Sequence, residues 1–408
     1  MHCGLLGRKL SHSYSPQIHQ MLGDYSYSLF EKEPEDLEFF LKNGNFTGIN
    51  VTIPYKKTVI PYLDELSPVA KKLDAVNTIV RRPDGSLFGH NTDYFGFQTM
   101  VSASGLSLAG KKALVLGSGG ASATAVCVLE EQGAVPVVIS RRGENNYGNL
   151  ENHVDAALIV NTTPMGMYPG TGETPVELSR FPALEGVLDV IYNPARTKLL
   201  MDAESRELVA MNGLLMLVAQ AKESSECFAG GSIPDEQIFR IHKVLSADMQ
   251  NIILIGMPGC GKSTLGRLLA EKCGKTFMDA DEQIVRLAGK TIPEIFAQDG
   301  QGSFRELETQ VLQQLGKQSG LVIATGGGCV TQSRNYPLLH QNGRILWIRR
   351  PVQLLPTEGR PLSSSGDLMQ MYQQRKPLYE AFADHIIENE GTPSDTLAAI
   401  LKLLEELQ

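Results

Sequence analysis

Short apolar runs rich in β-branched residues recur along the chain, and segments with apolar residues at helical spacing separate them. This alternation of strand and helix patterns predicts an α/β architecture with largely parallel sheets. The predicted strands are 112–116, 137–139, 157–160, 252–255, 321–323 and 345–348.

The same pattern predicts two domains. Residues 234–245 are expected to form a helix that closes the first domain, and residues 246–250 are the only connector before a new strand begins at Asn251. A length of 408 residues is enough for two or three units, each with a core of its own. We therefore expect domains at residues 1–246 and 251–408.

A glycine-rich turn follows the predicted strand 252–255. Residues 256–263 read Gly-Met-Pro-Gly-Cys-Gly-Lys-Ser, which matches the phosphate-binding motif G-x-x-x-x-G-K-[ST] and precedes a predicted helix over 263–272. In such a loop backbone N–H groups surround phosphate oxygens, the lysine reaches the β- and γ-phosphates, and the serine hydroxyl binds Mg²⁺. A plain strand-to-helix turn is the alternative. The predicted nucleotide-binding residues are Gly259, Gly261, Lys262, Ser263 and Thr264.

A second glycine-rich turn follows the predicted strand 112–116 and has the G-x-G-G form of a dinucleotide phosphate turn, which is a weak signal by itself. Arginines after the next strand, where an NAD-binding protein has an acidic residue, favour the 2′-phosphate of NADP. A solvated turn is the alternative for these arginines. Only 18 residues, 143–160, remain between Arg142 and Asn161, and residues 144–149 lack helical periodicity, so the helix that usually follows is expected to be trimmed. The predicted cofactor-binding residues are Gly117, Gly119, Gly120, Ala121, Arg141 and Arg142.

Composition narrows the class of function. The chain is 42% hydrophobic and 20% charged, which is ordinary for a globular protein, and its net charge is −8. Without a basic excess we expect neither nucleic acid nor membrane as a partner, but small-molecule substrates. The six cysteines form no C-x-x-C pair, and no apolar stretch is long enough to span a bilayer. We expect a cytoplasmic protein without disulfides or zinc.

A further set of motifs in the second half, taken in order, resembles shikimate kinase over residues 251–390. The resemblance implies a P-loop NTPase-type domain with a parallel sheet that transfers phosphate from ATP to shikimate. The motifs are Phe277-Met278-Asp279-Ala280-Asp281, Phe304-Arg305-Glu306-Leu307-Glu308, Gly326-Gly327-Gly328, Gly359-Arg360-Pro361-Leu362 and Arg375-Lys376-Pro377-Leu378-Tyr379.

The kinase resemblance also implies roles for single residues. Asp279 would join Ser263 at the Mg²⁺, and Asp281 would take the hydroxyl that is phosphorylated. A calcium loop starting at Asp279 is rejected, because Ile284 and Lys290 stand where such a loop needs Gly and Glu. Phe296 and Phe304 are interpreted as more typical of core than of a ligand wall. The remaining implied residues are Arg305, Gly327, Gly328 and Arg375 for shikimate and Arg360 for a lid over the phosphates.

This half departs from the family in two places. The stretch between Ile348 and Gly366, where the lid belongs, looks short. An arginine is also missing at the place where the family stacks one on adenine.

Five polar motifs in the first half, taken in order, resemble shikimate dehydrogenase over about residues 4–245. The resemblance implies a two-lobed fold, with a substrate lobe at about 1–100 plus 213–246 and a Rossmann-like NADP lobe at about 101–212. The motifs are Ser11-His12-Ser13-Tyr14-Ser15-Pro16, Asn50-Val51-Thr52-Ile53-Pro54-Tyr55-Lys56, Ala75-Val76-Asn77-Thr78, Asn91-Thr92-Asp93 and Gly213-Leu214-Leu215-Met216-Leu217-Val218-Ala219-Gln220.

By this resemblance Lys56 and Asp93 are the catalytic pair. Reducing a ketone with a hydride leaves an alkoxide-like oxygen, and an ammonium beside a carboxylate can stabilise its charge and supply a proton. Gly213 would contact the cofactor. The implied substrate-binding residues are Ser13, Ser15, Thr52, Asn77, Tyr192 and Gln220.

Together the two resemblances imply a bifunctional enzyme of aromatic amino-acid biosynthesis that makes shikimate with NADPH and phosphorylates it with ATP. A sensor or repressor that keeps both pockets without turnover is the alternative, and the retained catalytic residues argue against it. A preference for quinate is disfavoured by Ser13 and Ser15, by family resemblance. The oligomeric state stays open.

Overall fold

The computed structural model describes residues 1–10, 13–355 and 365–407. These residues form two compact units. The first contains Met1–Gly166, Thr174–Tyr192 and Asp202–Val244; the second contains Met167–Glu173, Asn193–Met201 and Leu245–Gln408. Within the described residues, the helices are all too short or too polar to cross a bilayer.

The first unit begins with a six-stranded sheet in the order β2-β1-β3-β5-β6-β4. Its strands are β1 (His2–Gly7), β2 (Ser26–Glu31), β3 (Gly48–Val51), β4 (Glu65–Leu66), β5 (Thr78–Arg81) and β6 (Leu87–His90). The sheet is mixed, because β5 pairs antiparallel with β3 and with β6. The pairs β1–β2, β1–β3 and β4–β6 are parallel, in line with the expected largely parallel sheets. Strand β5 is the exception, and only a short turn, closed by the Gly85 N–H donating to the Arg82 carbonyl, separates it from β6.

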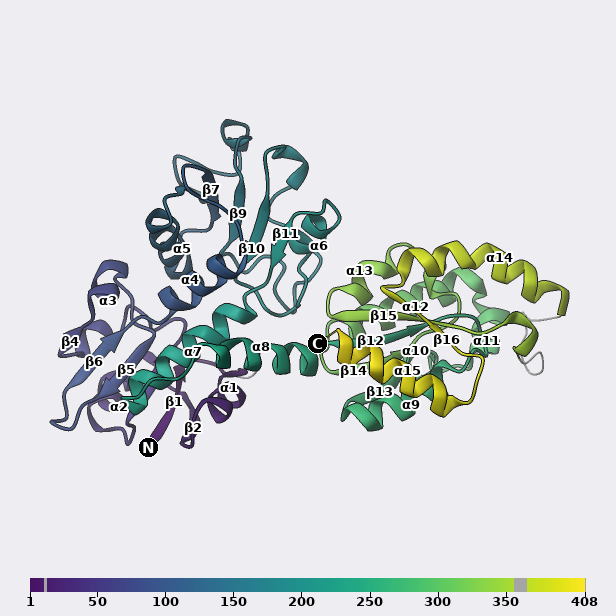
Figure 1. The fold of residues 1–408 in the computed structure, drawn as a ribbon, viewed down its shortest axis with the longest axis horizontal. Coiled ribbons are helices and arrows are strands. Elements are labelled where there is room, and N and C mark those ends of the chain that lie inside the picture. The colour runs from purple at the N-terminus through teal and green to yellow at the C-terminus, as the bar shows by residue number, and fades with distance from the viewer. Residues whose placement is uncertain (11–12, 356–364, 408) are drawn as a thin grey trace. The chain divides into compact units, whose positions relative to one another are not determined.

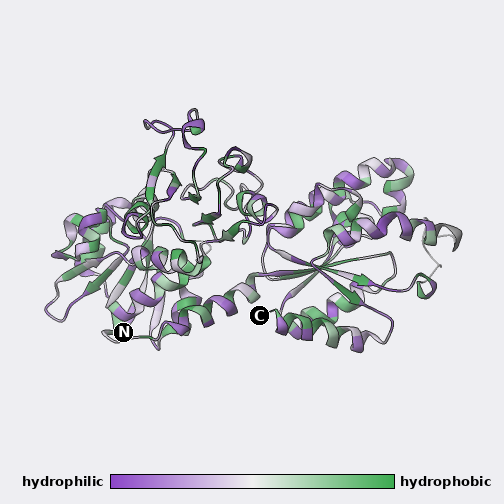
Figure 2. Ribbon diagram, turned by 45° about the horizontal axis from the view of Figure 1, so that its top comes forward, coloured by the Kyte–Doolittle hydropathy of each residue, from purple (hydrophilic) through white to green (hydrophobic). Residues whose placement is uncertain are grey.

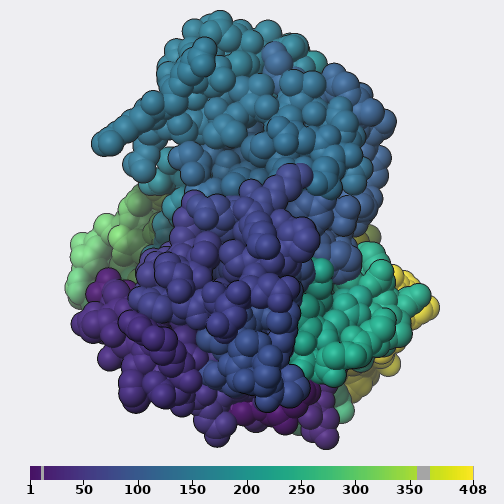
Figure 3. All heavy atoms as spheres, turned by 90° about the vertical axis from the view of Figure 1, so that its left-hand side faces the viewer, coloured from purple at the N-terminus to yellow at the C-terminus, as the bar shows by residue number. Residues whose placement is uncertain are grey.

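Helix α7 (Leu214–Ala229) returns to this sheet from late in the chain and packs against β3 and β5. A Cβ on Gly48 of β3 would lie 2.1 Å from the Phe228 ring of α7, so the two elements are in close contact. Figure 3 shows teal-green atoms from this part of the chain beside the purple and indigo atoms of the first hundred residues. The other helices of this lobe are α1 (Ser15–Leu22), α2 (Leu37–Asn43), α3 (Pro68–Leu73) and α4 (Asp93–Ala103).

A second sheet of the first unit is parallel throughout, in the order β11-β10-β9-β7-β8. Its central strands are apolar and buried, as parallel strands between layers must be. Between β8 and β9 the chain forms only the 3₁₀ turn Leu150–His153, which confirms the predicted loss of a helix there. The elements are β7 (Lys112–Leu116), α5 (Gly120–Glu131), β8 (Val135–Ile139), β9 (Leu158–Asn161), β10 (Gly186–Asp189) and β11 (Val209–Met211). Helix α6 (Lys198–Glu204) precedes β11 and begins among residues of the second unit.

The second unit is a parallel sheet in the order β13-β14-β12-β15-β16, with helices on both faces (Figure 1). The helices alternate hydrophobic and hydrophilic residues (Figure 2), as expected where one face packs on a sheet. Its elements are β12 (Asn251–Ile255), α9 (Lys262–Cys273), β13 (Thr276–Asp279), α10 (Ala280–Ala288), α11 (Ile292–Gln298), α12 (Gly300–Gly316), β14 (Leu321–Ala324), α13 (Asn335–His340), β15 (Gly343–Arg349), α14 (Ser365–Phe382), β16 (His385–Glu388) and α15 (Pro393–Glu406).

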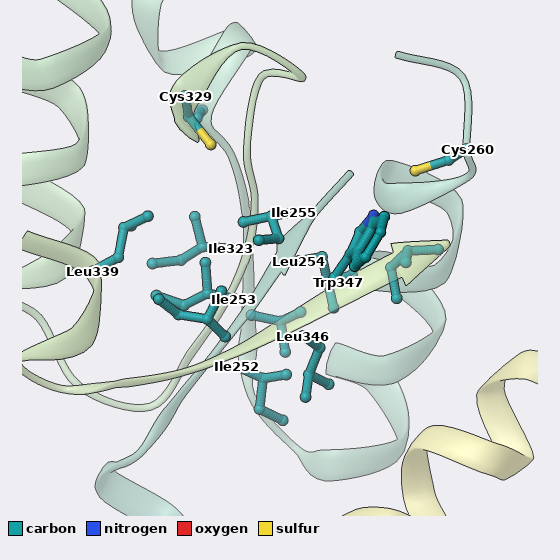
Figure 4. Packing of buried hydrophobic residues seen from close by; sticks show 14 of the residues in the cluster. Ile252, Ile253, Leu254, Ile255, Cys260, Ile323, Cys329, Leu339, Leu346 and Trp347 are labelled. Carbon is teal, nitrogen blue, oxygen red and sulfur yellow. The ribbon is translucent and has the colours of Figure 1, made fainter. Parts of the chain in front are cut away.

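The core of the second unit lies along β12 and β15, where Ile253, Leu254 and Leu346 have no exposed surface (Figure 4). The single tryptophan of the chain, Trp347, is 1% exposed in this core and stacks on Tyr379. Its fluorescence therefore reports on the folding of this unit.

The connector expected at residues 246–250 is wrong, because most of it belongs to helix α8 (Glu236–Met249). The helix continues through residues 246–249, so Gln250 alone separates it from β12. The Nζ of Lys275 donates to the carbonyl oxygens of Ala247, Asp248 and Gln250 at 2.8, 2.9 and 2.9 Å. A lysine among the last carbonyls satisfies acceptors that a helix end leaves open, which explains why the helix extends.

Two glycines of helix α12 allow a test of how closely this helix packs against its neighbours in the second unit. A Cβ on Gly316 would lie 1.8 Å from the Leu338 carbonyl oxygen, whereas a Cβ on Gly302 in the same helix would meet nothing within 4 Å. Gly316→Ala should lower the free energy of unfolding of the second unit by about 1–3 kcal/mol, because backbone must move. Gly302→Ala should not lower it. Urea unfolding followed by Trp347 fluorescence measures both, and equal midpoints would contradict the packing described.

Candidate active sites

The first unit contains a cavity of about 270 Å³ at the ends of β1 and β3. It is lined by residues from both halves of the unit, including Ala121 at the start of α5 and Gln220 on α7. The structure thus brings together residues as far apart in the sequence as Leu5 and Gln220. The lining residues that the sequence singled out are Ser13, Ser15, Thr52, Lys56, Asn77, Asp93, Ala121, Tyr192, Gly213 and Gln220.

Lys56 and Asp93 form an ion pair at the edge of this cavity. The Lys56 Nζ lies 2.6 Å from the Asp93 Oδ2, and the two side chains are 28% and 14% exposed. Asp93 is the first residue of α4, where the helix dipole favours a carboxylate. A proton donor held by a carboxylate and open to the cavity can stabilise a developing oxyanion and protonate it.

Other polar groups of the cavity are held by local structure. The Ser15 N–H donates to the Ser13 Oγ at 3.2 Å, which holds the Ser13 hydroxyl beside the start of α1, where Ser15 is the first residue. Burial raises the pKa of Tyr192, so its phenol stays neutral and can donate a hydrogen bond. The preceding motif residues Ser11 and His12 lie outside the described residues.

Asn50, Leu5 and Met216 also line the cavity, although they were not singled out. Asn50 lies within a quoted motif but looks from the sequence like an ordinary strand residue. Only the strand register and the return of α7 show that these residues border the site.

The predicted cofactor turn lies at the carboxyl end of β7. Gly117 has φ 110°, which favours glycine, and its N–H donates to the Ile139 carbonyl oxygen of β8. The first N–H groups of α5 start at Gly120, where a Cβ would meet nothing within 4 Å. Arg141 and Arg142 follow β8 at this same edge and are exposed. The turn, the helix start and the arginines together form a surface that suits an anionic dinucleotide.

Gly213 begins the turn into α7, where only glycine fits. A Cβ there would lie 2.1 Å from the Val190 carbonyl oxygen. Its place among the lining residues, with Ala121 of α5, puts it on the side of the cavity that adjoins the predicted cofactor turn.

The second unit contains a cavity of about 630 Å³ between the glycine-rich loop and α12. Every described residue that the sequence assigned to this half lines it, whereas Arg360 lies outside the described residues. These residues are Gly259, Gly261, Lys262, Ser263, Thr264, Asp279, Asp281, Arg305, Gly327, Gly328 and Arg375.

The glycine-rich loop has the backbone of a phosphate cradle. Gly256, Gly259 and Gly261 all have positive φ, which lets successive N–H groups turn inward before α9 begins. The Lys262 Nζ is buried and donates to the carbonyl oxygens of Gly256 and Met257 at 2.9 and 3.0 Å. Its charge therefore lies within the loop.

Ser263 and Asp279 form the part of this cavity that suits Mg²⁺. The Ser263 Oγ donates to the Asp279 Oδ2 at 2.6 Å, and the other Asp279 oxygen caps α10. Clusters of three or more His, Cys, Asp or Glu are absent from the described residues. A nucleotide-bound Mg²⁺ needs only one or two protein oxygens besides phosphates and water, so the pair fits this ion.

The opposite end of the cavity is lined by buried charges. The Arg305 Nη1 donates to the Glu308 Oε2 at 2.7 Å, and Glu308 has no exposed surface. Burial raises the pKa of Glu308, and Arg305 opposes that rise. Burial, followed by the charge of Asp279, likewise raises the pKa of Asp281, while Lys262 and Arg305 lower it. Cations thus help to keep two carboxyl groups ionised at the place where an acceptor hydroxyl would bind.

Glu308 was missed as a site residue, although its spacing of three from Arg305 on α12 could have indicated a pair. Phe296 and Phe304 stack with ring centroids 4.8 Å apart and line the cavity. The interpretation of Phe304 as core is correct but incomplete, because its ring also forms part of the site wall.

Glycines 326–328 let the charged side chains of this cavity lie close to the backbone of the loop. A Cβ on Gly328 would lie 2.1 Å from an Arg305 guanidinium nitrogen. The Gly327 carbonyl oxygen accepts hydrogen bonds from the Arg375 Nη1 at 3.1 Å and the Tyr379 hydroxyl at 2.5 Å. The loop therefore leaves room for Arg305 and binds Arg375, and both arginines line the same cavity as Asp281.

Comparison with known proteins agrees with this geometry. The family model for the shikimate dehydrogenase substrate binding domain matches residues 5–79, and the shikimate kinase model matches residues 258–407. Shikimate dehydrogenase (NADP(+)) of Clostridium beijerinckii is 36% identical over 243 residues, which cover 55% of this chain and 90% of that protein. The chain belongs to the shikimate dehydrogenase family. Its last part is a shikimate kinase domain, so both recognised resemblances are confirmed.

Solved structures support the assignment of the first part. Shikimate dehydrogenase 1 from Peptoclostridium difficile is 37% identical with a TM-score of 0.55, covering 60% of this chain and 97% of that chain. A chorismate mutase/shikimate 5-dehydrogenase fusion protein from Clostridium acetobutylicum is 36% identical with a TM-score of 0.57, covering 60% and 96%. The shikimate 5-dehydrogenase from Thermus thermophilus, solved with NADP(H) and shikimate, is 29% identical with a TM-score of 0.54, covering 60% and 99%.

The raised pKa of Asp281 predicts a stability effect with a definite sign. A carboxyl whose folded-state pKa is raised destabilises the fold when it ionises, and this cost disappears as the pH falls through the folded-state pKa towards the ordinary value of 3.8. Asp281→Asn should therefore raise the melting temperature of the kinase unit at pH 7 and lose that advantage near pH 4. Trp347 fluorescence follows the melt, with the exposed Glu271→Gln as control. A variant less stable than the parent at pH 7 would contradict the burial described.

Proposed function

We propose that this chain reduces 3-dehydroshikimate to shikimate with NADPH and then phosphorylates the 3-hydroxyl of shikimate with ATP. The observation that carries the proposal is a Lys56–Asp93 ion pair at one cavity and a glycine-rich loop with Asp281 at another, on one chain. The product of the first reaction is the substrate of the second. A non-catalytic sensor is not favoured, because both sets of reactive groups are retained.

For the reduction, NADPH supplies the hydride to the substrate carbonyl carbon. The Lys56 ammonium would donate a proton to the carbonyl oxygen as the C–O double bond becomes single, and Asp93 keeps Lys56 oriented. Ser13, Ser15 and Thr52 would bind the carboxylate and hydroxyls of the substrate. Asn77 and Gln220 would also bind these groups, with Tyr192 closing the pocket.

For the phosphorylation, Asp281 orients the acceptor hydroxyl and takes its proton, while Lys262 and the loop N–H groups neutralise the phosphates. Arg305 and Arg375 would bind the shikimate carboxylate beside Gly327 and Gly328. Mg²⁺, held through Ser263 and Asp279, would neutralise charge between the β- and γ-phosphates. Thr264 and Arg360 complete the proposed nucleotide contacts.

The domain division belongs to the same proposal, with a dehydrogenase part at 1–246 and a kinase part at 251–408. The matched ranges 5–79 and 258–407 support it. A cytoplasmic location stays a prediction from the cysteine pattern.

Separate half-reactions test the bifunctional proposal. Lys56→Ala should abolish NADPH oxidation with 3-dehydroshikimate and leave phosphorylation of added shikimate intact, because its ammonium serves one site only. Lys262→Ala should have the opposite pattern, since it removes the only loop side chain that neutralises β/γ-phosphate charge. Loss of both activities in either variant, without unfolding, would contradict two independent sites. A parent protein that consumes neither cofactor would favour the sensor.

The preference for NADPH over NADH tests whether the arginines after β8 bind the 2′-phosphate. A charge-assisted contact to the 2′-phosphate contributes about 1.5–3 kcal/mol, so Arg141→Ala should reduce the NADPH-over-NADH ratio of kcat/KM by roughly one to two orders of magnitude. Arg142→Ala, measured in parallel, shows how the two guanidinium groups share the phosphate. An unchanged NADPH-over-NADH ratio in both variants would show that the 2′-phosphate binds elsewhere.

A further inference from the structure

A buried hydroxyl lies behind the wall of the dehydrogenase cavity without lining it. Ser224 of α7 has no exposed surface and follows the cavity residue Gln220 by one helical turn. Four polar groups surround its Oγ: the Asn50 Nδ2 at 2.7 Å, the Thr78 Oγ1 at 2.9 Å, the Thr92 Oγ1 at 3.0 Å and the Gln220 carbonyl oxygen at 2.9 Å. These groups come from separate segments, so Ser224 joins α7 to the strands β3 and β5 and to the turn before α4.

Two of these neighbours hold the side chain of Asn77, which lines the cavity. The Asn77 Oδ1 accepts from the Thr92 N–H at 2.7 Å and from the Thr78 Oγ1 at 3.1 Å. The Asn77 Nδ2 donates to the Thr92 Oγ1 at 3.1 Å. The amide oxygen is thus committed to the protein, and one N–H of the amide remains for a ligand.

The number of available hydrogens decides which groups of the cluster donate and which accept. The Ser224 hydroxyl donates its single hydrogen to the Gln220 carbonyl oxygen, so it can only accept from Asn50. The other end of the Asn50 amide accepts from the Tyr27 hydroxyl at 2.8 Å. Both ends of Asn50 are therefore held, and the members are all nearly or fully buried. A buried network keeps one arrangement only while each donor has its acceptor.

We propose that Ser224 is a positioning residue for the dehydrogenase reaction, which holds the Thr92 hydroxyl so that Asn77 presents its free N–H to the substrate. This inference rests on the proposed dehydrogenase function. Without the Ser224 hydroxyl, the Asn50 Nδ2 and the Thr92 hydroxyl each lose their nearest acceptor. The Asn77 amide then no longer has a single favoured orientation, while the Lys56–Asp93 pair, which does not contact Ser224, is unaffected.

The neighbouring serine offers a matched control. Ser225 is equally buried on the same helix, but its Oγ accepts from the Tyr25 hydroxyl at 2.8 Å instead of joining the Asn77 cluster. In the full chain, Ser224→Ala should raise KM for shikimate about tenfold in NADP⁺-dependent oxidation, with little change in kcat or in KM for NADP⁺. Ser225→Ala should leave all three parameters within about twofold of the parent.

A second pair of variants keeps the proposal testable if Ser224→Ala does not fold. Thr78→Val removes a hydroxyl of the same cluster at nearly constant volume and should raise KM for shikimate in the same way. Thr78→Ser keeps the hydroxyl, so its KM for shikimate should stay close to that of the parent. An unchanged kcat and an unchanged KM for NADP⁺ in each variant check that the dehydrogenase unit is folded. Equal KM values for the Ser224 and Ser225 variants, or for the two Thr78 variants, would overturn the proposal. A parent that does not oxidise shikimate with NADP⁺ would instead overturn the proposed function.

Discussion

Both sites depend on one constraint: an anionic cofactor must be bound by a chain that carries a net charge of −8. The parallel sheets meet this constraint at their carboxyl edges, where a buried strand turns sharply into a helix and leaves backbone N–H groups free. The turn at Gly117 leads into α5, and the loop from Gly256 leads into α9. Positive φ at these glycines makes the turns possible, and the remaining site residues are arranged around them.

The charged side chains of the two sites differ in how far they are exposed to solvent. Lys56 and Asp93 are partly exposed, so their ion pair can form and reform as a substrate oxygen changes charge. In the kinase unit, Glu308 is buried and Asp281 is half-buried near Arg305, and burial raises the pKa of both. Two carboxyl groups in such a place cost folding free energy, which is typical of functional sites and unusual in a core built only for stability.

Much of each site was predictable because its parts are continuous in sequence. The glycine-rich loop, the Asp279–Asp281 segment and the polar motifs around Lys56 and Asp93 each present their residues from one short stretch of backbone. Residues that act across elements were less visible. Glu308, Asn50 and the two site phenylalanines resemble ordinary helix or strand residues until strand order and helix packing place them at a cavity.

The sequence by itself determined the α/β class, the strands before both glycine-rich turns, the missing helix after Arg142 and many of the residues that line the two cavities. These features follow from local backbone preference and from hydrophobic periodicity, which act over a few residues. Only the tertiary structure decided that β5 pairs antiparallel, that α8 runs to Met249 under the Lys275 ammonium, and that Ser224 lies among Asn50, Thr78 and Thr92. Those outcomes depend on hydrogen bonds between residues as many as 174 positions apart, and no local pattern encodes such a partner.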